Sequence, residues 1–313
     1  MDWIDAFVFI CYNSVMKEKE VTELSGTIMI GIILIMRVVQ SVCSKQASND
    51  LPLSWTGRFS YFGFSHLCSA LCALPVFLVD GAHVTASAVI LGIGSGICIV
   101  IASVCSQLAL QSGTMALSSM FSAAGLLIPC VTGIFWFDQP MSLWQWLAVI
   151  VLLGATYLLV ISSRTVYARF SLKTIWLLLG SFLANGATML LQTVYSLHSG
   201  GENVAGFSFF TFAVPAVLLI GMAHCTGTGE QRQLPKRLYG LGICLAVALF
   251  VINQLATQAA AVVPGAVLFT LISGSTTVIS ALVGAFLYRE KLGISGIIGL
   301  VIGVAALVII KAC

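Results

Sequence analysis

The chain has 313 residues, of which 59% are hydrophobic and only 8% are charged. Soluble proteins carry roughly 25% charged residues, so this composition and a mean hydropathy of +1.06 exclude a soluble domain. The net charge is only +3, and no basic cluster with interleaved aromatic residues accompanies it, so we expect no nucleic-acid partner. Apolar runs along the whole chain predict an all-α, polytopic membrane protein in a lipid bilayer.

Ten apolar stretches of roughly 20 residues are each long enough to cross a bilayer as a helix. In chain order they are 24–44, 59–79, 86–109, 113–136, 142–162, 172–197, 204–224, 237–259, 264–288 and 292–311. Residues 1–23 precede them, and we interpret these residues as an N-terminal interfacial segment. The alternative is that residues 3–16 insert as an eleventh span, which would reverse the topology.

The two parts of the chain on either side of residues 163–171 are similar. Residues 24–162 and 172–313 each contain five expected spans in the same order, and 163–171 is a linker between them. In each part an acidic residue, Asp138 or Glu290, ends the fourth span. Because five is an odd number, the second part would enter the membrane upside down, as in the inverted repeats of many secondary transporters.

With this doubled repeat and its two acidic residues, the chain resembles the EamA-like families of the drug/metabolite transporter superfamily. Glu290 is followed by Gly299 and Asp138 by Gly154, at spacings that the family shares. The resemblance covers nearly the whole chain and implies a secondary transporter or facilitator with a central cavity for a small-molecule substrate. We expect a multi-pass protein of the bacterial plasma membrane, with a homodimer as a possible assembly. The alternative within transporters is a nucleotide-sugar or phosphate-ester carrier.

A polar stripe closes the first expected span. Arg37, Gln40, Ser41, Ser44 and Lys45 recur at the spacing of one helix face. Charged groups on a membrane helix are costly, so by default they mark a functional site. The alternative is that the two cations snorkel to the interface while the other side chains form interhelical hydrogen bonds.

Three further spans carry uncharged polar stripes. These are Ser103, Ser106, Gln107 and Gln111 in the third span, Asn185, Thr188, Gln192 and Tyr195 in the sixth, and Asn253, Gln254, Thr257 and Gln258 in the eighth. Interhelical hydrogen bonding could explain any one of them, but stripes on the first and third spans of both repeats favour a shared cavity. We expect its lining to include Arg37, Gln40, Ser44, Gln107, Asn185, Gln192, Gln254 and Gln258.

No Asp or Glu lies inside an expected span, although proton-coupled exchange usually needs a carboxylate there. We therefore expect a facilitator or uniporter, with His66 as the best titratable alternative. Together, Arg37 and Lys45 favour an anionic or carboxylate-bearing solute.

The sequence carries no HExxH or GxSxG motif and no paired intramembrane aspartates, so we do not expect an enzyme. The ten Cys lie mostly in apolar runs without a CxxC pair, and we expect neither a metal nor another cofactor. A non-transporting scaffold is a further alternative, and it would have an apolar, filled centre instead of a polar cavity.

Overall fold

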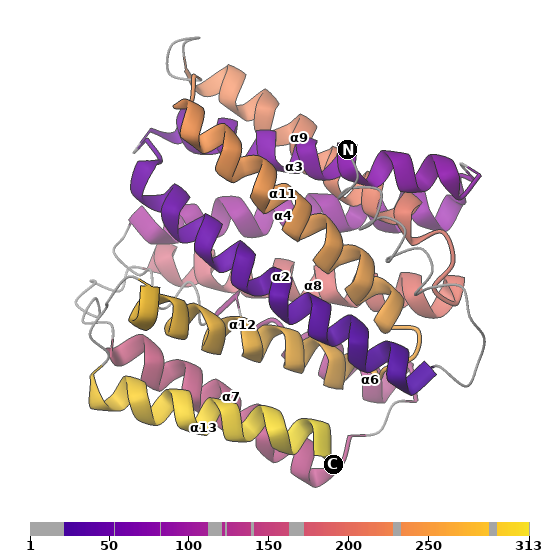
Figure 1. The fold of residues 1–313 in the computed structure, drawn as a ribbon, viewed down its shortest axis with the longest axis vertical. Helices are drawn as coiled ribbons and strands as arrows, with labels where there is room; N and C mark the ends of the chain where they lie inside the picture. The colour runs from indigo at the N-terminus through magenta and orange to yellow at the C-terminus, as the bar shows by residue number, and fades with distance from the viewer. Residues whose placement is uncertain are drawn as a thin grey trace.

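The computed structural model describes residues 22–52, 54–81, 83–111, 121–122, 124–138, 141–162, 172–227, 233–287 and 293–312. In these residues the regular structure is helical throughout, without a strand (Figure 1). The helices are α2 (Thr22–Asp50), α3 (Trp55–Val79), α4 (Ala86–Gln111), α6 (Leu127–Trp136), α7 (Leu143–Ser162), α8 (Leu172–Ser199), α9 (Val204–Thr226), α11 (Lys236–Ala259), α12 (Gly265–Leu287) and α13 (Ile294–Ala312).

Seven of these helices are long and apolar enough to cross a membrane: α2, α3, α4, α8, α9, α11 and α12. The apolar stretches within the other three described helices are shorter, at Leu127–Trp136, Leu143–Leu159 and Ile294–Ile310. The expectation of an all-helical, polytopic membrane protein is therefore met at this coarser level. These seven helices indicate an integral membrane protein.

The end of α2 and the start of α3 differ from the expected spans. α2 continues to Asp50, well past the expected end at residue 44, because the polar residues that follow the apolar run continue the helix. α3 begins at Trp55 instead of residue 59, since the Ser54 hydroxyl accepts a hydrogen bond from the Gly57 N–H at 3.2 Å and caps the first turn.

Several of the expected features lie outside the described residues. They are the linker 163–171, Glu290, and the interfacial segment 1–23 except for its last two residues, which open α2. Asp138 is described: it is exposed, follows the end of α6, and has a left-handed φ of 50°. Its position is that of a residue that ends a helix.

The helices pack in pairs that join distant parts of the sequence. α3 packs against α9 at one end of the molecule in Figure 1, and α7 packs against α13 at the other end. Between them, α2 contacts α11, α4 contacts α8, and α6 contacts α12. Each of these pairs joins one helix from before residues 163–171 with one helix from after them, so the two parts of the chain share one core.

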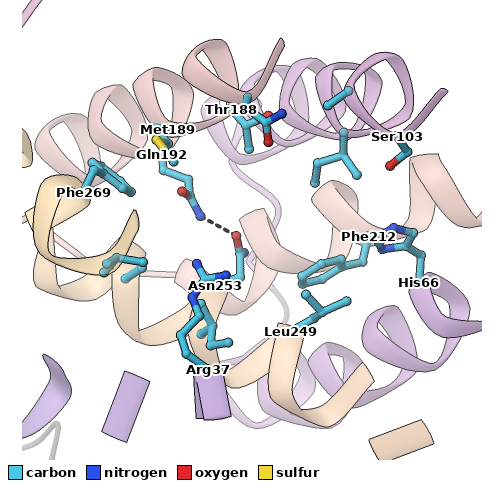
Figure 2. Close-up of a pocket in the computed structure, with 16 residues that line it drawn as sticks. Arg37, His66, Ser103, Thr188, Met189, Gln192, Phe212, Leu249, Asn253 and Phe269 are labelled. Carbon is cyan, nitrogen blue, oxygen red and sulfur yellow. Dashed lines mark hydrogen bonds between the residues drawn. The ribbon is translucent and has the colours of Figure 1, made fainter. Parts of the chain in front are cut away.

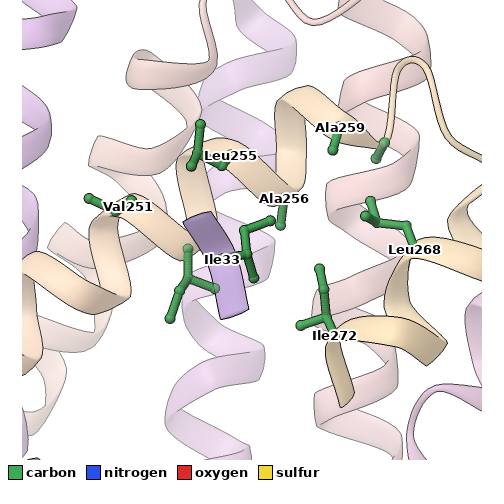
Figure 3. Packing of buried hydrophobic residues seen from close by; sticks show 9 residues of the cluster. Ile33, Val251, Leu255, Ala256, Ala259, Leu268 and Ile272 are labelled. Atoms are coloured by element: carbon green, nitrogen blue, oxygen red, sulfur yellow. The ribbon is translucent and has the colours of Figure 1, made fainter. Parts of the chain in front are cut away.

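A buried apolar cluster fixes α2 against α11 and α12 (Figure 3). Ile33 is completely buried among Val251, Leu255 and Ile272. Residues four positions apart share a helix face, so the packing of Ile33 also turns Arg37 toward the interior. The position of the cation thus depends on apolar burial one turn earlier in the helix.

Two glycines allow α4 to approach α9 closely. A Cβ atom at Gly96 would lie 2.7 Å from the Val214 Cβ, and one at Gly92 would lie 3.0 Å from the Phe207 carbonyl oxygen. Small residues allow such backbone contact between membrane helices, where lipid provides no hydrophobic driving force for association.

We expect Gly96→Ala to lower stability by roughly 1–3 kcal/mol, because the added methyl overpacks the α4–α9 interface. Gly221→Ala on α9 is the matched control, since a Cβ there meets nothing within 4 Å. Thermal unfolding of the purified variants in detergent measures the difference. Equal melting temperatures would contradict the close approach.

Tyr195 ties the end of α8 to the start of α9. Its hydroxyl donates to the carbonyl oxygens of Glu202 at 3.1 Å and Asn203 at 2.8 Å. Its buried ring stacks on Phe207 with centroids 4.5 Å apart. The Asn203 side-chain amide in turn donates to the His83 carbonyl at 2.5 Å, so the turn is attached to the segment before α4 as well.

Removing this hydroxyl in Tyr195→Phe should cost roughly 1–2 kcal/mol, because buried carbonyl groups lose their donor while the ring stacking remains. The exposed Tyr239 provides a Tyr→Phe control in which no more than a few tenths of a kcal/mol should change. Chemical denaturation monitored by circular dichroism compares the two. A loss in Tyr195→Phe no larger than in the control would disprove the anchoring role.

Candidate functional site

A cavity of about 230 Å³ lies between helices from both parts of the chain (Figure 2). α2, α3 and α4 contribute lining residues from the first part, and α8, α9, α11 and α12 from the second. Its polar lining residues are Arg37, His66, Ser103, Asn185, Thr188, Gln192 and Asn253. The cavity is therefore mixed in character, with amide, hydroxyl, imidazole and guanidinium groups among apolar ones.

The polar groups of α8 are held in place by hydrogen bonds. The Asn185 side-chain amide donates to the Ser181 carbonyl at 2.9 Å, and Ser181 also bonds the hydroxyls of Ser106 and Ser122 at 2.8 Å each. The Thr188 hydroxyl donates to the Ala184 carbonyl at 3.0 Å. This side of the cavity is preorganised, since its donors are already committed within the protein.

A chain of hydrogen bonds joins α8, α11 and α9 behind the cavity. The Gln192 side-chain amide donates to the Asn253 Oδ1, as Figure 2 shows. The Asn253 Nδ2 donates to the Ser208 hydroxyl at 3.0 Å, and Ser208 donates to the Gln254 Oε1 at 3.0 Å. Gln192 and Asn253 are buried, so each amide needs its partner in the chain.

Two further polar groups belong to α2 and α3. Arg37 donates from Nη1 to the Gln40 Oε1 at 2.8 Å, one turn along its own helix, while its Nε is buried without a hydrogen-bond partner. His66 stacks on Phe212 of α9 with centroids 5.9 Å apart and an interplanar angle of 20°. Its Nδ1 is likewise buried and unpartnered.

Of the residues expected to line a cavity, Arg37, Asn185 and Gln192 do line this one. Gln40 and Gln254 are not among its lining residues; Gln40 accepts a hydrogen bond from Arg37, and Gln254 accepts one from Ser208. Ser44 is exposed on α2, and the Oε1 of Gln258 is buried without a partner. The side chain of Gln107 is outside the described part of the chain.

Other lining residues were less accessible to sequence reasoning. Asn253, Ser103 and Thr188 belong to the polar stripes of α11, α4 and α8, so the pattern identified their helices. The apolar lining carries no polar signal in the sequence, and only the packing of the helices reveals it. Its members are Ile99, Ala102, Met189, Phe212, Leu249, Ile252, Ala256, Phe269 and Ile272.

The site offers binding chemistry. In the described residues no group of three His, Cys, Asp or Glu side chains is placed to hold a metal ion. The described lining contains no carboxylate, and it combines one guanidinium with neutral donors, acceptors and aromatic rings. Such a lining suits recognition of a small solute with a polar end and an apolar body.

Comparison with known proteins extends the account of the fold. No protein-family model and no curated protein matches the chain. Among solved structures, one described only as "Crystal structure of protein" matches with a TM-score of 0.72 and 13% sequence identity, covering 92% of this chain and 96% of that one. The likeness shows a shared fold. At 13% identity it does not show that the two proteins share a function.

Coupling between Gln192 and Asn253 can be measured with a double-mutant cycle. For Gln192→Leu and Asn253→Leu we expect a coupling free energy of at least about 0.6 kcal/mol, the mean for hydrogen bonds inside membrane proteins. Gln192→Leu combined with Thr132→Val is the control, because Thr132 donates within α6 to the Ile128 carbonyl. The control pair should be additive. Additivity in both pairs would show that the amide bond contributes nothing.

Proposed function

We propose that this chain is a secondary transporter or facilitator that moves a small metabolite across the membrane through this cavity. In this proposal the chain has ten spans, arranged as two inverted five-helix repeats at 24–162 and 172–313, like the EamA-like members of the drug/metabolite transporter superfamily. The observation that carries the proposal is that both parts of the chain contribute polar side chains to one central cavity.

Helix pairing supports the repeat. In chain order, α2, α3, α4, α6 and α7 correspond to α8, α9, α11, α12 and α13. Three packed pairs, α3–α9, α6–α12 and α7–α13, join corresponding helices. Several other pairs exchange when the repeats are swapped: α4–α8 becomes α2–α11, α4–α9 becomes α3–α11, and α6–α8 becomes α2–α12. A pseudo-two-fold axis produces this pattern. The contacts of α12 with α13 and α7, and of α11 with α8 and α9, have no comparably extensive counterpart among the described residues.

The size of the cavity favours a small solute over a nucleotide sugar. At about 230 Å³, it is smaller than the roughly 300–1,000 Å³ of pockets for drug-sized ligands. A nucleotide-sugar or phosphate-ester carrier is therefore the less favoured alternative. A non-transporting scaffold is also less favoured, because it would have an apolar, filled centre, whereas polar side chains line this cavity.

The described acidic residues lie at helix ends, which favours facilitated movement over coupling through an intramembrane carboxylate. His66 is the candidate for any coupling to protons, since it lines the cavity. The proposed setting is the bacterial plasma membrane, and the proposed partners are lipid, the solute and, in a homodimer, a second copy. An enzymatic role is not proposed.

The test fills the cavity without changing the outside of the protein. Ala102 lines the cavity, and its neighbour Ile101 is 45% exposed on the outer face of α4. Proteoliposomes are incubated with a mixture of labelled metabolites, and the retained solutes are identified by mass spectrometry. We expect uptake by the wild type and by Ile101→Phe, and uptake near the protein-free level for Ala102→Phe.

Folding of each variant is checked by size-exclusion chromatography and thermal unfolding. Normal uptake by a folded Ala102→Phe protein would place the solute path elsewhere. Absence of uptake for every solute class in the wild type would overturn the transport proposal itself.

A further inference from the structure

Arg37 is the one side chain with a permanent charge among the described residues that line the cavity. Its place between α2 and the rest of the bundle is fixed by the burial of Ile33 one turn earlier. In Figure 2 the side chain rises from α2 toward Asn253 and the cavity. The cation is therefore a built part of the cavity lining.

The described acidic residues lie at helix ends, and among the described side chains none forms an ion pair with Arg37. All of them lie at or within two residues of a helix end: Glu23, Asp50, Asp80, Asp138 and Glu202. Asp50 is about 20 Å further along α2 at a rise of roughly 1.5 Å per residue, and it pairs with Arg237 at 3.2 Å. An intramembrane cation of this kind is costly unless a negative charge joins it.

The hydrogen bonding of Arg37 leaves one edge of the guanidinium for a ligand. Nη1 is held by the Gln40 Oε1 at 2.8 Å, whereas the Nε is buried without a partner. Nε and Nη2 form the side edge of the planar group, and two parallel N–H donors there match the two oxygens of a carboxylate. Gln40 thus orients the guanidinium through Nη1 and does not occupy the Nε–Nη2 edge.

The rest of the lining indicates the remainder of the solute. Met189, Phe212, Leu249 and Phe269 provide an apolar surface for a compact hydrocarbon body. The neighbouring amide side chains and Thr188 are neutral and already hydrogen-bonded within the protein. An amino acid would bring an ammonium group for which the described lining has no carboxylate, and a phosphate dianion would face a single cation.

We propose that the cavity binds a small organic monocarboxylate, with its carboxylate on the Nε–Nη2 edge of Arg37 and its apolar body against Phe212 and Phe269. This assignment names the substrate class of the transporter proposed above and rests on that function only for translocation. Binding itself follows from the geometry of the cavity. The solute class is defined by one negative charge, no positive charge and a short apolar body.

Three probes with one carbon skeleton test the assignment on the purified wild-type protein: 4-methylpentanoate, 4-methylpentanamide and leucine. A ligand that binds the folded state raises the melting temperature, so thermal shift and isothermal titration rank the three. We expect binding by the carboxylate and at least roughly tenfold weaker binding by the amide, which lacks the charge. Leucine should bind more weakly as well. Equal binding by the amide or leucine, or no binding by the carboxylate, would overturn the assignment.

Variants assign the effect to Arg37. Arg37→Gln should weaken binding of 4-methylpentanoate at least roughly tenfold, whereas Lys45→Gln on the same helix should leave it unchanged. Unaltered affinity in a folded Arg37→Gln protein would contradict the proposal, as would equal loss in both variants. The comparison of acid with amide needs only the wild type, so it decides the matter even if Arg37→Gln does not fold.

Transport is measured separately in proteoliposomes loaded with the same probes. If the carboxylate binds through Arg37 but no solute crosses, the transporter proposal fails and the binding site stands. If neutral solutes cross while carboxylates neither bind nor compete, the carboxylate assignment fails and the transporter proposal stands.

Discussion

The structure depends on one constraint: polar side chains inside an apolar helix bundle must find their hydrogen-bond partners in the protein. Lipid supplies none, and an unsatisfied buried group costs free energy comparable to a lost hydrogen bond. The chain from Gln192 through Asn253 and Ser208 to Gln254 meets this requirement across three helices. These bonds help to fix the relative positions of α8, α9 and α11, and the cavity lies between these helices and their neighbours.

Where close contact is needed, small residues replace polar ones. Gly92 and Gly96 bring α4 against the backbone of α9. Gly299 does the same for α13 and α7, since a Cβ atom added there would lie 2.8 Å from the Ala155 carbonyl oxygen. Small residues thus make the α4–α9 and α7–α13 contacts close, while the amides that line the cavity belong to α8 and α11. A solute path through the centre needs this division, because water and solute must meet polar groups without loosening the outer packing.

The polar stripes of the sequence indicated α2, α4, α8 and α11 as cavity helices, whereas α3, α9 and α12 also line the cavity and carry no such stripe. The sequence could not decide which of two adjacent residues points inward, because neighbours differ by about 100° around a helix. Asn253 lines the cavity whereas Gln254 does not, and Ser44 is exposed although Arg37 on the same helix lines the cavity. Phe212 and Phe269 look like any apolar residue of a span, so only tertiary packing reveals them.

The central claim is that water and solute reach one cavity between the two parts of the chain, and cysteine labelling tests it most directly. In a Cys-free background, Thr188→Cys would report from the cavity lining and Leu183→Cys from the outer face of the same helix, where Leu183 is 56% exposed. A membrane-impermeant methanethiosulfonate reagent is applied from either side of sealed vesicles. The account predicts that the cavity cysteine reacts from both sides while the outer one does not. Labelling of neither cysteine, or equal labelling of both, would contradict it.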